Sequence, residues 1–330
     1  MASVSAHNTT ARSIGAPAHL RPPPGRTVTI LLCTFNGERF LAEQLESLQR
    51  QSFTNWKLIV SDDGSSDRTR SILQAFKVSQ QPRQVDIVDG PRRGASANFL
   101  FLACREDLTS DYYAFCDQDD IWEADKLERA IGILERMDAS VPAVYGSRTR
   151  VIDAAGRETG LSPLFSKAPT FRSALVQSIA GGNTMVFNQK ARDLLAYGGA
   201  DVIVPSHDWW LYQAASACGG HFHYDAWPSV RYRQHAQNVI GSNIGLAARM
   251  QRLRMLGQGR FRHWSNLNVA ALDRLRPRMT AESQQIFDLF CKARHQPLPQ
   301  RAAMFAQAGF YRQTLFGNLG LAIAVALKMI

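Results

Sequence analysis

The sequence predicts an α/β fold in which helices flank both faces of a mainly parallel sheet. Two observations lead to this prediction. Between residues 27 and 137, short apolar runs alternate with stretches whose apolar residues recur at helical spacing. Polar, acidic and turn-forming residues follow each apolar run. Strands that alternate with helices at this spacing pair in parallel, because each helix returns the chain to the same edge of the sheet.

The first apolar run sets the pattern for those that follow. Residues 27–33 (TVTILLC) are rich in β-branched side chains and too few for a helix, which indicates a buried strand. In the next segment, apolar residues at 40, 41, 45 and 48 share one helical face. The predicted elements, in chain order, are strand 27–33, helix 39–51, strand 56–61, helix 67–78, strand 85–88, helix 95–105, strand 112–116 and helix 123–137.

The pattern changes beyond residue 141. Residues 143–147 and 150–153 are typical of two antiparallel strands. A helix is predicted to begin at SHDWW, residues 206–210, and to run to about residue 217. Two short strands, 221–225 and 229–233, then precede His235. We expect helices from residue 242 onward.

The composition divides the chain into three predicted segments. Residues 1–26 are small and polar and end in an Arg- and Pro-rich stretch, so we expect a disordered leader without the apolar core of a secretory signal. Residues 27–241 form the predicted α/β domain, and residues 242–330 form a helical, basic C-terminal region. The five cysteines form no CxxC pair, which indicates free thiols in a reducing compartment. We therefore expect a cytoplasmic protein.

Positive charge is concentrated near the C-terminus. Residues 231–330 contain fifteen Lys and Arg residues and three acids, whereas the chain as a whole carries +10. Such a region can face nucleic acid, anionic lipid or an anionic lipid-linked substrate, and no nucleic-acid-binding motif accompanies it. We therefore expect no nucleic-acid partner. Residues 319–330 are too short to cross a bilayer of about 30 Å, but the apolar segment from residue 310 either lies on a membrane surface or packs on the core.

Polar residues follow four of the predicted strands at the point where each strand ends. Open parallel sheets bind ligands in the crevice beyond the carboxyl ends of their strands. The sequence therefore predicts the functional site at this edge. The segments concerned are TFNGE at 34–38, DDGSSD at 62–67, DGPRRG at 89–94 and DQDD at 117–120.

Asp117 and Asp119 give the sharpest chemical signal. Two carboxylates one residue apart at a strand end can both face a hard divalent cation, Mg²⁺ or Mn²⁺, and a diphosphate would supply further oxygens. Helix capping is the alternative, since Asp120 and Glu123 fit a capping box. Capping accounts for Asp120 but gives no reason for Asp117 and Asp119, so we favour metal binding for these two.

The DDGSSD motif at 62–67 is a weaker signal by itself. Turn chemistry alone favours Asp, Gly and Ser, and Ser66 suits a helix N-cap. A carboxylate at the crevice can also accept hydrogen bonds from a pyrimidine N3–H or from ribose hydroxyls. The motif becomes informative because it shares an edge with Asp117 and Asp119.

Four segments in fixed order carry a family resemblance: LLCTFNGERFLAEQLESLQRQSF, VSDDGSSD, FCDQDDIW and HDWW, with YRQHAQNVIG downstream. Together they resemble the family 2 inverting glycosyltransferases of the GT-A fold, and are most similar to bacterial rhamnosyltransferase-like enzymes of surface polysaccharide synthesis. The resemblance covers residues 27 to about 242. It implies a GT-A (Rossmann-like) catalytic domain over residues 27–241.

The resemblance also implies a role for each matching residue. Asp208 matches the catalytic base; the family more often has Glu before this Asp, so His207 is a departure whose role stays open. Asp117 and Asp119 match the DxD pair, with Asp119 the usual direct metal ligand, and His235 matches a late histidine that completes the metal shell. The positions implied for nucleotide-sugar binding are Thr34, Asn36, Glu38, Asp62, Asp63, Arg92, Arg93, Asn98 and Asp117.

Several of these residues also have a purely structural interpretation. Asp208 suits the first turn of a helix, where a negative charge contributes about 0.3–1 kcal/mol. A lone histidine such as His235 is more often a surface or core residue than a ligand. We expect Gly182, Asn183 and Trp209 to contact the acceptor; the alternatives are a tight turn for the first two and core packing for the tryptophan.

The resemblance implies metal-dependent transfer of L-rhamnose or a related hexose from a dTDP- or UDP-sugar to a hydroxyl of a glycan or lipid-linked acceptor. Asp208 would take the acceptor proton, and Mg²⁺ or Mn²⁺ would stabilise the leaving diphosphate. The basic C-terminal region suits a protein that works at the cytoplasmic face of the inner membrane, with an anionic membrane surface as a partner. Two alternatives remain: a metal-dependent phosphohydrolase and a non-catalytic nucleotide-sugar-binding subunit.

Overall fold

The computed structural model describes residues 22–235 and 259–330 of the chain. The predicted leader up to residue 21 and the start of the predicted C-terminal region, residues 242–258, lie outside these ranges. Arg26 already belongs to the folded structure, since its guanidinium pairs with Asp111 at 3.1 Å and with Glu135 at 2.6 Å. The described chain therefore joins the fold one residue before the first predicted strand.

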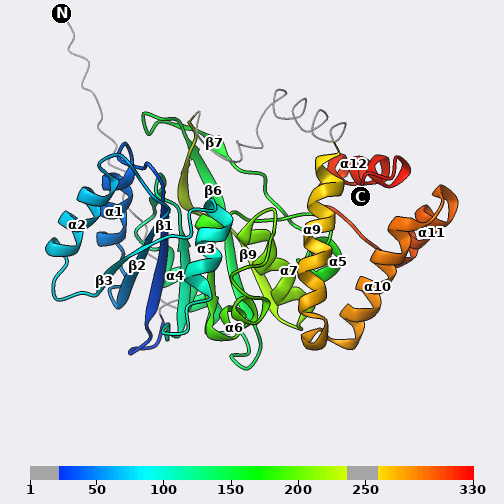
Figure 1. Cartoon of the computed structure of the whole chain (residues 1–330), viewed down its shortest axis with the longest axis horizontal. Coiled ribbons are helices and arrows are strands. Elements are labelled where there is room, and N and C mark those ends of the chain that lie inside the picture. Colours follow the sequence, from blue (N-terminus) through cyan, green and yellow to red (C-terminus); the bar gives the residue numbers. More distant parts are fainter. Residues whose placement is uncertain (1–21, 236–258) are drawn as a thin grey trace, which may run out of the picture.

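One mixed sheet of nine strands runs through the described structure (Figure 1). Its strands lie in the order β3-β2-β1-β4-β8-β6-β9-β5, and β7 pairs with β6 outside this path. Four pairs are parallel, and they include the longest registers in the sheet: β3–β2, β2–β1, β1–β4 and β6–β9. The strands are β1 (Val28–Thr34), β2 (Trp56–Asp62), β3 (Val85–Asp89), β4 (Tyr112–Cys116), β5 (Ile121–Trp122), β6 (Ala143–Ile152), β7 (Glu158–Leu161), β8 (Val186–Asn188) and β9 (His221–Arg233).

Helices cover both faces of the sheet, as the alternating pattern predicts. They are α1 (Leu41–Gln49), α2 (Thr69–Ser79), α3 (Ala95–Ala103), α4 (Lys126–Leu134), α5 (Phe171–Ala174), α6 (Gln189–Gly198), α7 (His207–Ala217), α9 (Arg260–Arg274), α10 (Ala281–His295), α11 (Leu298–Ala308) and α12 (Leu315–Ala326). Two short 3-10 turns are η2 (Gly182–Thr184) and η3 (Arg276–Arg278).

The sheet separates two hydrophobic clusters, because successive side chains of a strand point to opposite faces. In β1, Ile30 and Leu32 join the cluster that contains Leu45 of α1. Leu31 joins the other cluster, which contains Phe99 of α3.

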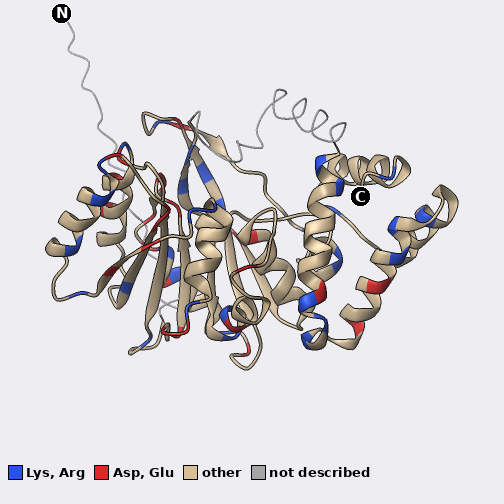
Figure 2. Ribbon diagram, viewed as in Figure 1, with Lys and Arg blue, Asp and Glu red and all other residues tan. Residues whose placement is uncertain are grey.

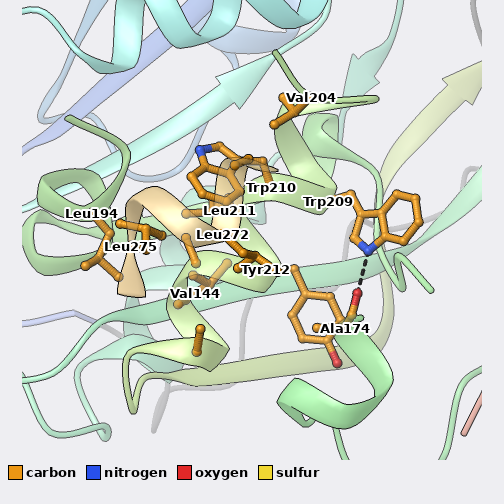
Figure 3. Packing of buried hydrophobic residues seen from close by; sticks show 14 of the residues in the cluster. Val144, Ala174, Leu194, Val204, Trp209, Trp210, Leu211, Tyr212, Leu272 and Leu275 are labelled. Carbon is orange, nitrogen blue, oxygen red and sulfur yellow. Dashed lines mark hydrogen bonds between the residues drawn. The ribbon is translucent and has the colours of Figure 1, made fainter. Parts of the chain in front are cut away.

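This second cluster extends to the C-terminal helices. Figure 3 shows Trp210 of α7 in one cluster with Leu272 and Leu275, which belong to α9 and the residue after it. Phe287 of α10 and Leu321 of α12 belong to the same cluster. The C-terminal helices therefore share the core on the α7 side of the sheet.

The structure corrects two strand predictions and adds three strands. The predicted pair 143–147 and 150–153 is a single strand, β6, and the predicted pair 221–225 and 229–233 is a single strand, β9. A register shift between Ser147 and Thr149 lets the β6–β9 ladder continue past the irregular stretch. The additional strands are β5, which pairs with β9, β7, which pairs with β6, and β8, which pairs with β4 and β6.

All five cysteines are free thiols in the described structure. Within the described residues, none of the helices combines the length and the apolar character needed to cross a membrane.

Candidate active site

The strand register brings the predicted site residues to one edge of the sheet. Thr34 pairs in register with Asp62, and Asp62 with Asp89. On the other side of β1, Leu32 is level with Cys116, so Asp117 follows at the same edge. Burial raises the pKa of the neighbouring Cys33 thiol, and the charges of Asp117 and Asp63 raise it further. These two carboxylates therefore lie close to one thiol.

The loop after β1 is held by the loop after β2. Asn36 has a positive φ of 47° and its side-chain Oδ1 accepts a hydrogen bond of 2.9 Å from the Ser66 backbone N–H. Glu38 Oε2 accepts from the Arg68 backbone N–H at 3.1 Å. Ser66 is therefore not the N-cap of α2, which begins at Thr69. The exposed Asn36 and Glu38 stand on a loop that is fixed before any ligand arrives.

Asp62 is the buried centre of this loop pair. Its side chain is 1% exposed, and Oδ1 accepts from the Thr34 hydroxyl at 2.9 Å and from the Ser65 hydroxyl at 2.5 Å. Its Oδ2 accepts from the Ser65 backbone N–H at 3.1 Å. The structure shows Asp62 and Thr34 organising the loop from within.

Asp63 holds the loop that follows β3. Its two oxygens accept from the backbone N–H groups of Arg92 at 2.6 Å and Gly94 at 2.9 Å. Arg92 adopts a positive φ of 57°, and the side chains of Arg92 and Arg93 are exposed at this edge. Two guanidinium groups at this edge of the sheet suit contact with phosphates.

Asn98 has a different place from the one expected for a nucleotide contact. Its side chain is 1% exposed, accepts from the Ser61 hydroxyl at 2.5 Å and donates to the Ser61 carbonyl at 3.0 Å. Both ends of the amide are thus used to fasten α3 to β2. A role of Asn98 in nucleotide binding stays a prediction.

Four carboxylates gather beyond β4, and we call Asp117, Asp119, Asp120 and Asp208 the acidic cluster. Burial raises the pKa of Asp117 well above its usual range, and the charges of Asp120, Asp119 and Asp208 raise it further. Hydrogen bonds connect Asp208 to the same place, since Gly182 of the turn η2 donates to Asp208 and the next residue, Asn183, donates to Asp120. The structure therefore brings Asp208, which lies far along the chain in α7, toward the strand end that carries Asp117.

Asp208 is held from the opposite side by the turn η2. Its Oδ2 accepts a hydrogen bond of 3.0 Å from the Gly182 backbone N–H, and its Oδ1 accepts from the Trp209 backbone N–H at 2.6 Å. The side chain keeps part of its surface exposed. A carboxylate with a fixed orientation and solvent access can accept a proton from a bound hydroxyl.

Asp119 and His235 meet at the end of β9. Asp119 Oδ2 lies 2.7 Å from His235 Nε2, and the Asp119 carbonyl accepts from Arg233 Nε at 2.9 Å. A carboxylate beside an imidazole is a donor pair that fits a divalent cation. Within residues 22–235 and 259–330, no group of three or more His, Cys, Asp or Glu side chains is arranged as a complete metal site. The protein side of such a site would thus be these two residues.

Asp120 is not the helix cap that the capping-box alternative predicts. Helix α4 begins at Lys126, six residues later, and Asp120 instead precedes strand β5. Its fully buried carboxylate accepts from Asn183 Nδ2 at 2.5 Å and from the Arg233 backbone N–H at 3.0 Å. Burial, followed by the charge of Asp119, raises the pKa of Asp120 to about 7. Asp120 ties η2 and β9 to the cluster.

A buried lysine supplies positive charge to the same cluster. Lys126 is 0% exposed, donates from Nζ to the Asn183 carbonyl at 2.8 Å, and places Nζ 3.2 Å from the centre of the Trp122 ring. Burial lowers the pKa of Lys126 to about 7, while the charges of Cys116, Asp120 and Asp117 raise it. Lys126 in turn lowers the pKa values of Asp117 and Asp120.

His207, the departure from the family pattern, is buried against aromatic rings. Its ring stacks on Phe99 at 3.9 Å between centroids and meets Phe115 edge-on at 4.7 Å. Nε2 finds no hydrogen-bond partner within the described structure. A Cβ added at Gly182 would lie 2.3 Å from this atom, so the glycine lets η2 approach the ring. Burial lowers the pKa of His207 to about 4, and the imidazole is therefore neutral.

The three residues expected to contact the acceptor have separate places. Gly182 presents its N–H to Asp208, as described. Asn183 is 4% exposed and its side chain is bonded to Asp120. Trp209 is 6% exposed, and its Nε1 donates to the Ala174 carbonyl at 2.7 Å (Figure 3). Trp209 therefore packs in the core, and its contact with the acceptor stays a prediction.

Sequence reasoning missed three residues that shape the site. Gln118 clamps the loop after β1, since its Oε1 accepts from Phe35 N at 2.8 Å and its Nε2 donates to Phe35 O at 2.9 Å. Arg233, 2% exposed, links Asp119 to Glu43 through its guanidinium. Lys126 occupies a buried position of α4. In the sequence, the available signal was a charged residue within the apolar face of the predicted helix, because an unpaired lysine is rarely buried.

Comparisons with known proteins agree with this geometry. A model of a family described as "Glycosyl transferase family 2" matches residues 29–195. A Shigella flexneri protein named dTDP-rhamnosyl transferase RfbG is 32% identical over 235 residues, which span 67% of this chain and 78% of that protein. An Escherichia coli protein named UDP-Glc:alpha-D-GlcNAc-diphosphoundecaprenol beta-1,3-glucosyltransferase WfgD is 32% identical over 120 residues, 36% of this chain and 45% of that protein.

A solved structure confirms the fold. The crystal structure of S. aureus TarS residues 1–349 in complex with UDP-GlcNAc superposes with a TM-score of 0.52 at 14% identity, covering 91% of this chain and 90% of that chain. At this identity the likeness concerns the fold alone. The GT-A-like sheet with flanking helices, followed by C-terminal helices, is therefore the predicted architecture.

Proposed function

The chain belongs to glycosyl transferase family 2, and on that premise we propose that Asp208 acts as the general base of an inverting sugar transfer. The observation that supports this proposal is the convergence of the acidic cluster, which joins the carboxyl end of β4 to the start of α7. An inverting transfer needs one base for the acceptor and a site for the leaving diphosphate, and no enzyme nucleophile. The cluster and its neighbours offer both.

Asp208 is suited to take the acceptor proton. The acceptor hydroxyl attacks the anomeric carbon, its O–H proton passes to Asp208, and the bond from the anomeric carbon to the diphosphate oxygen breaks. The Gly182 N–H, 3.0 Å from Oδ2, fixes the carboxylate during this step. A general base in a fixed position contributes about 10²–10⁴-fold to the rate.

The leaving diphosphate would bind on the side of the acidic cluster away from Asp208. We propose Asp119 and His235 as the protein ligands of a divalent cation, Mg²⁺ or Mn²⁺, with Asp117 beside them, because the donor pair is preassembled and the crowded carboxylates gain from a cation. When bound, the cation supplies Lewis-acid stabilisation of the departing negative charge. The exposed side chains of Arg92 and Arg93 add positive charge at the nucleotide edge.

We propose L-rhamnose, or a related hexose, as the transferred sugar and dTDP or UDP as its carrier. The support is the 32% identity to a protein named as a dTDP-rhamnosyl transferase, which spans most of both chains. From a β-linked dTDP-L-rhamnose, inversion would give an α-rhamnoside. The nucleotide itself would lie along the loops that carry Thr34, Asn36, Glu38, Asp62 and Asp63.

We propose a glycan or lipid-linked acceptor in surface polysaccharide synthesis, reached from the cytoplasmic face of the inner membrane. The name of the E. coli relative includes a diphosphoundecaprenol-linked substrate, which supports a lipid-linked acceptor here. The basic C-terminal region, with fifteen Lys and Arg in residues 231–330, suits an anionic membrane surface. The phosphohydrolase alternative uses Asp117 as a nucleophile, so a phosphoenzyme trapped on Asp117 would favour that alternative.

A thermal-shift panel tests the donor site. Nucleoside diphosphates and their sugars are added to the purified protein with and without Mn²⁺ or Mg²⁺. We expect dTDP or UDP to raise the melting temperature only with metal, because a ligand that binds the folded state stabilises it by mass action. Stabilisation by an unrelated nucleotide, or equal stabilisation without metal, would contradict the proposed donor or the proposed metal.

Asp208→Asn tests the base. We expect donor-induced stabilisation to be retained and turnover to fall by about 10²–10⁴-fold. Asp193→Asn is the matched control, because that carboxylate lies on α6 with half of its side chain exposed. A variant Asp208→Asn that transfers sugar at the wild-type rate would refute the assignment, and loss of donor binding would indicate a structural role.

A further inference from the structure

Helix α12 has an apolar face that the rest of the described chain does not cover. Leu315 is 86% exposed, Leu319 58%, Ile323 41% and Leu327, the residue after the helix, 59%. These positions recur every four residues and therefore form one stripe along the helix. No residue of α12 carries a charge. Large apolar side chains gathered on one exposed face mark an interaction surface.

The exposed stripe belongs to an ordered helix and not to a loose end. Thr314 caps the first turn by accepting from the Gly317 N–H at 3.0 Å. At the other end, the buried Arg301 donates to the carbonyls of Val325 at 2.6 Å and Ala326 at 3.1 Å. Leu321 and Val325 pack in the core. The opposite face of α12 is thus anchored, which fixes the exposed face in place.

The charges around α12 suit an anionic partner. Arg260 and Arg262, at the start of α9, and Lys328, just after α12, are exposed. The guanidinium of Arg312 lies 5.0 Å from the ring centre of Phe261, which brings the start of α9 to the segment that leads into α12. In Figure 2 the ribbon is blue at this end of α9.

The acids of this region are neutralised or distant. The three acids of residues 259–330 are in ion pairs: Asp273 and Asp288 with Arg276, and Glu282 with Arg172. In Figure 2 the red parts of the α9 and α10 ribbons lie away from α12. These acids therefore do not offset the positive charges of Arg260, Arg262 and Lys328.

We propose that the exposed face of α12, with its border of Arg260, Arg262 and Lys328, is a docking surface for an anionic lipid bilayer. A twelve-residue helix is too short to span a bilayer but can lie in its interface, apolar side down, with cations at the level of the headgroups. In Figure 1, α12 lies at the end of the molecule toward which β9 runs, where His235 follows. Docking would turn that end, with the site, toward the membrane; only this last point rests on the proposed function.

Vesicle co-sedimentation tests the surface without any sugar donor, so its outcome is independent of catalysis. We expect the full-length protein to bind vesicles of phosphatidylcholine mixed with phosphatidylglycerol more strongly than phosphatidylcholine alone. The double variant Leu319→Gln, Ile323→Gln should lower the partition coefficient by about tenfold or more on both kinds of vesicle, since two apolar side chains leave the interface. Val78→Gln, on the 70% exposed Val78 of α2, is the matched control and should bind as the wild type does.

The charged border is tested by Arg260→Ala, Arg262→Ala. Each substitution should lower binding to the anionic vesicles by about fivefold and leave binding to phosphatidylcholine unchanged. Light scattering on the same proteins detects the competing occupant, a second copy of the chain. The proposal is overturned if the wild type ignores anionic vesicles, if the double variant at positions 319 and 323 binds them as the wild type does, or if that variant only converts a dimer to a monomer.

Discussion

Replacing His207 by Leu should change how the stability of the protein depends on pH. The imidazole is 8% exposed, packed between Phe99 and Phe115, and its Nε2 has no hydrogen-bond partner within the described structure. Burial lowers its pKa from 6.5 to about 4. The titration of a histidine with a lowered pKa in the folded state contributes almost nothing to stability above pH 7 and opposes folding as the pH falls through 6.5, because the unfolded chain then binds a proton that the folded chain does not.

The size of the effect follows from the displaced pKa. A pH of 5 lies about 1.5 units below the pKa of the unfolded histidine, which is then protonated, whereas the folded histidine is still neutral. One pKa unit corresponds to about 1.4 kcal/mol of free energy. Between pH 7 and pH 5 the free energy of unfolding of the wild type should therefore fall by about 2 kcal/mol more than that of His207→Leu. Urea unfolding of both proteins across this range measures the difference, and exposed His295→Leu gives the background of removing a histidine. Parallel curves for wild type and His207→Leu would refute a buried neutral imidazole.

Three further predictions concern the same site. Gly182→Ala should lower the free energy of unfolding by about 1–3 kcal/mol and reduce turnover, because the new Cβ would lie 2.3 Å from His207 Nε2. The control Gly320→Ala has open space around the new Cβ and should be neutral or stabilising in urea unfolding. Lys126→Met should lower the free energy of unfolding by up to about 3–5 kcal/mol. It should also move the acidic limb of the pH–rate profile to higher pH, because the positive charge that lowers the pKa of Asp117 is lost. An unchanged profile would exclude this coupling. Mn²⁺ should release protons when it binds near pH 6, measured by calorimetry in buffers of different ionisation enthalpy, since a cation lowers the raised pKa of Asp117; equal heats in all buffers would contradict it.

The first half of the fold was readable from the sequence because its strands are buried on both faces. Strands β1, β2 and β4 lie within one residue of the predicted bounds, since their apolar runs end where polar turns begin. The later strands were predicted in pieces because local signals interrupt them. Residues 226–228, which include Pro228, lie between the two predicted strands of this region. The β6–β9 ladder skips these residues after the pair Ser147 and Asp225 and resumes at Thr149 and Val230, so β9 is one strand.

The site was readable only as far as its motifs extend. The order of motifs predicted that Asp117, Asp119 and His235 share an edge, and the structure places Asp119 and His235 2.7 Å apart. The partners of Asp120 had no local signal, because Asn183 and Arg233 contact it from 63 and 113 residues away. A capping box was the available local interpretation, and only the tertiary contacts show why it is wrong.

The acidic cluster explains why so much of the surrounding fold consists of fixed donors. Four carboxylates in one place repel each other, and part of their hydration is lost on folding, so the folded chain carries an electrostatic cost before any ligand binds. The donors that offset this cost come from different elements: the Gly182 N–H on Asp208, Asn183 and the Arg233 N–H on Asp120, and the charge of Lys126 beside Asp117 and Asp120. Because η2 supplies the first two of these contacts and accepts the hydrogen bond of Lys126, this one turn couples the proposed base to the strand end. A cation at Asp119 and His235 would remove the remaining cost, so the site holds charge that only its ligands can balance.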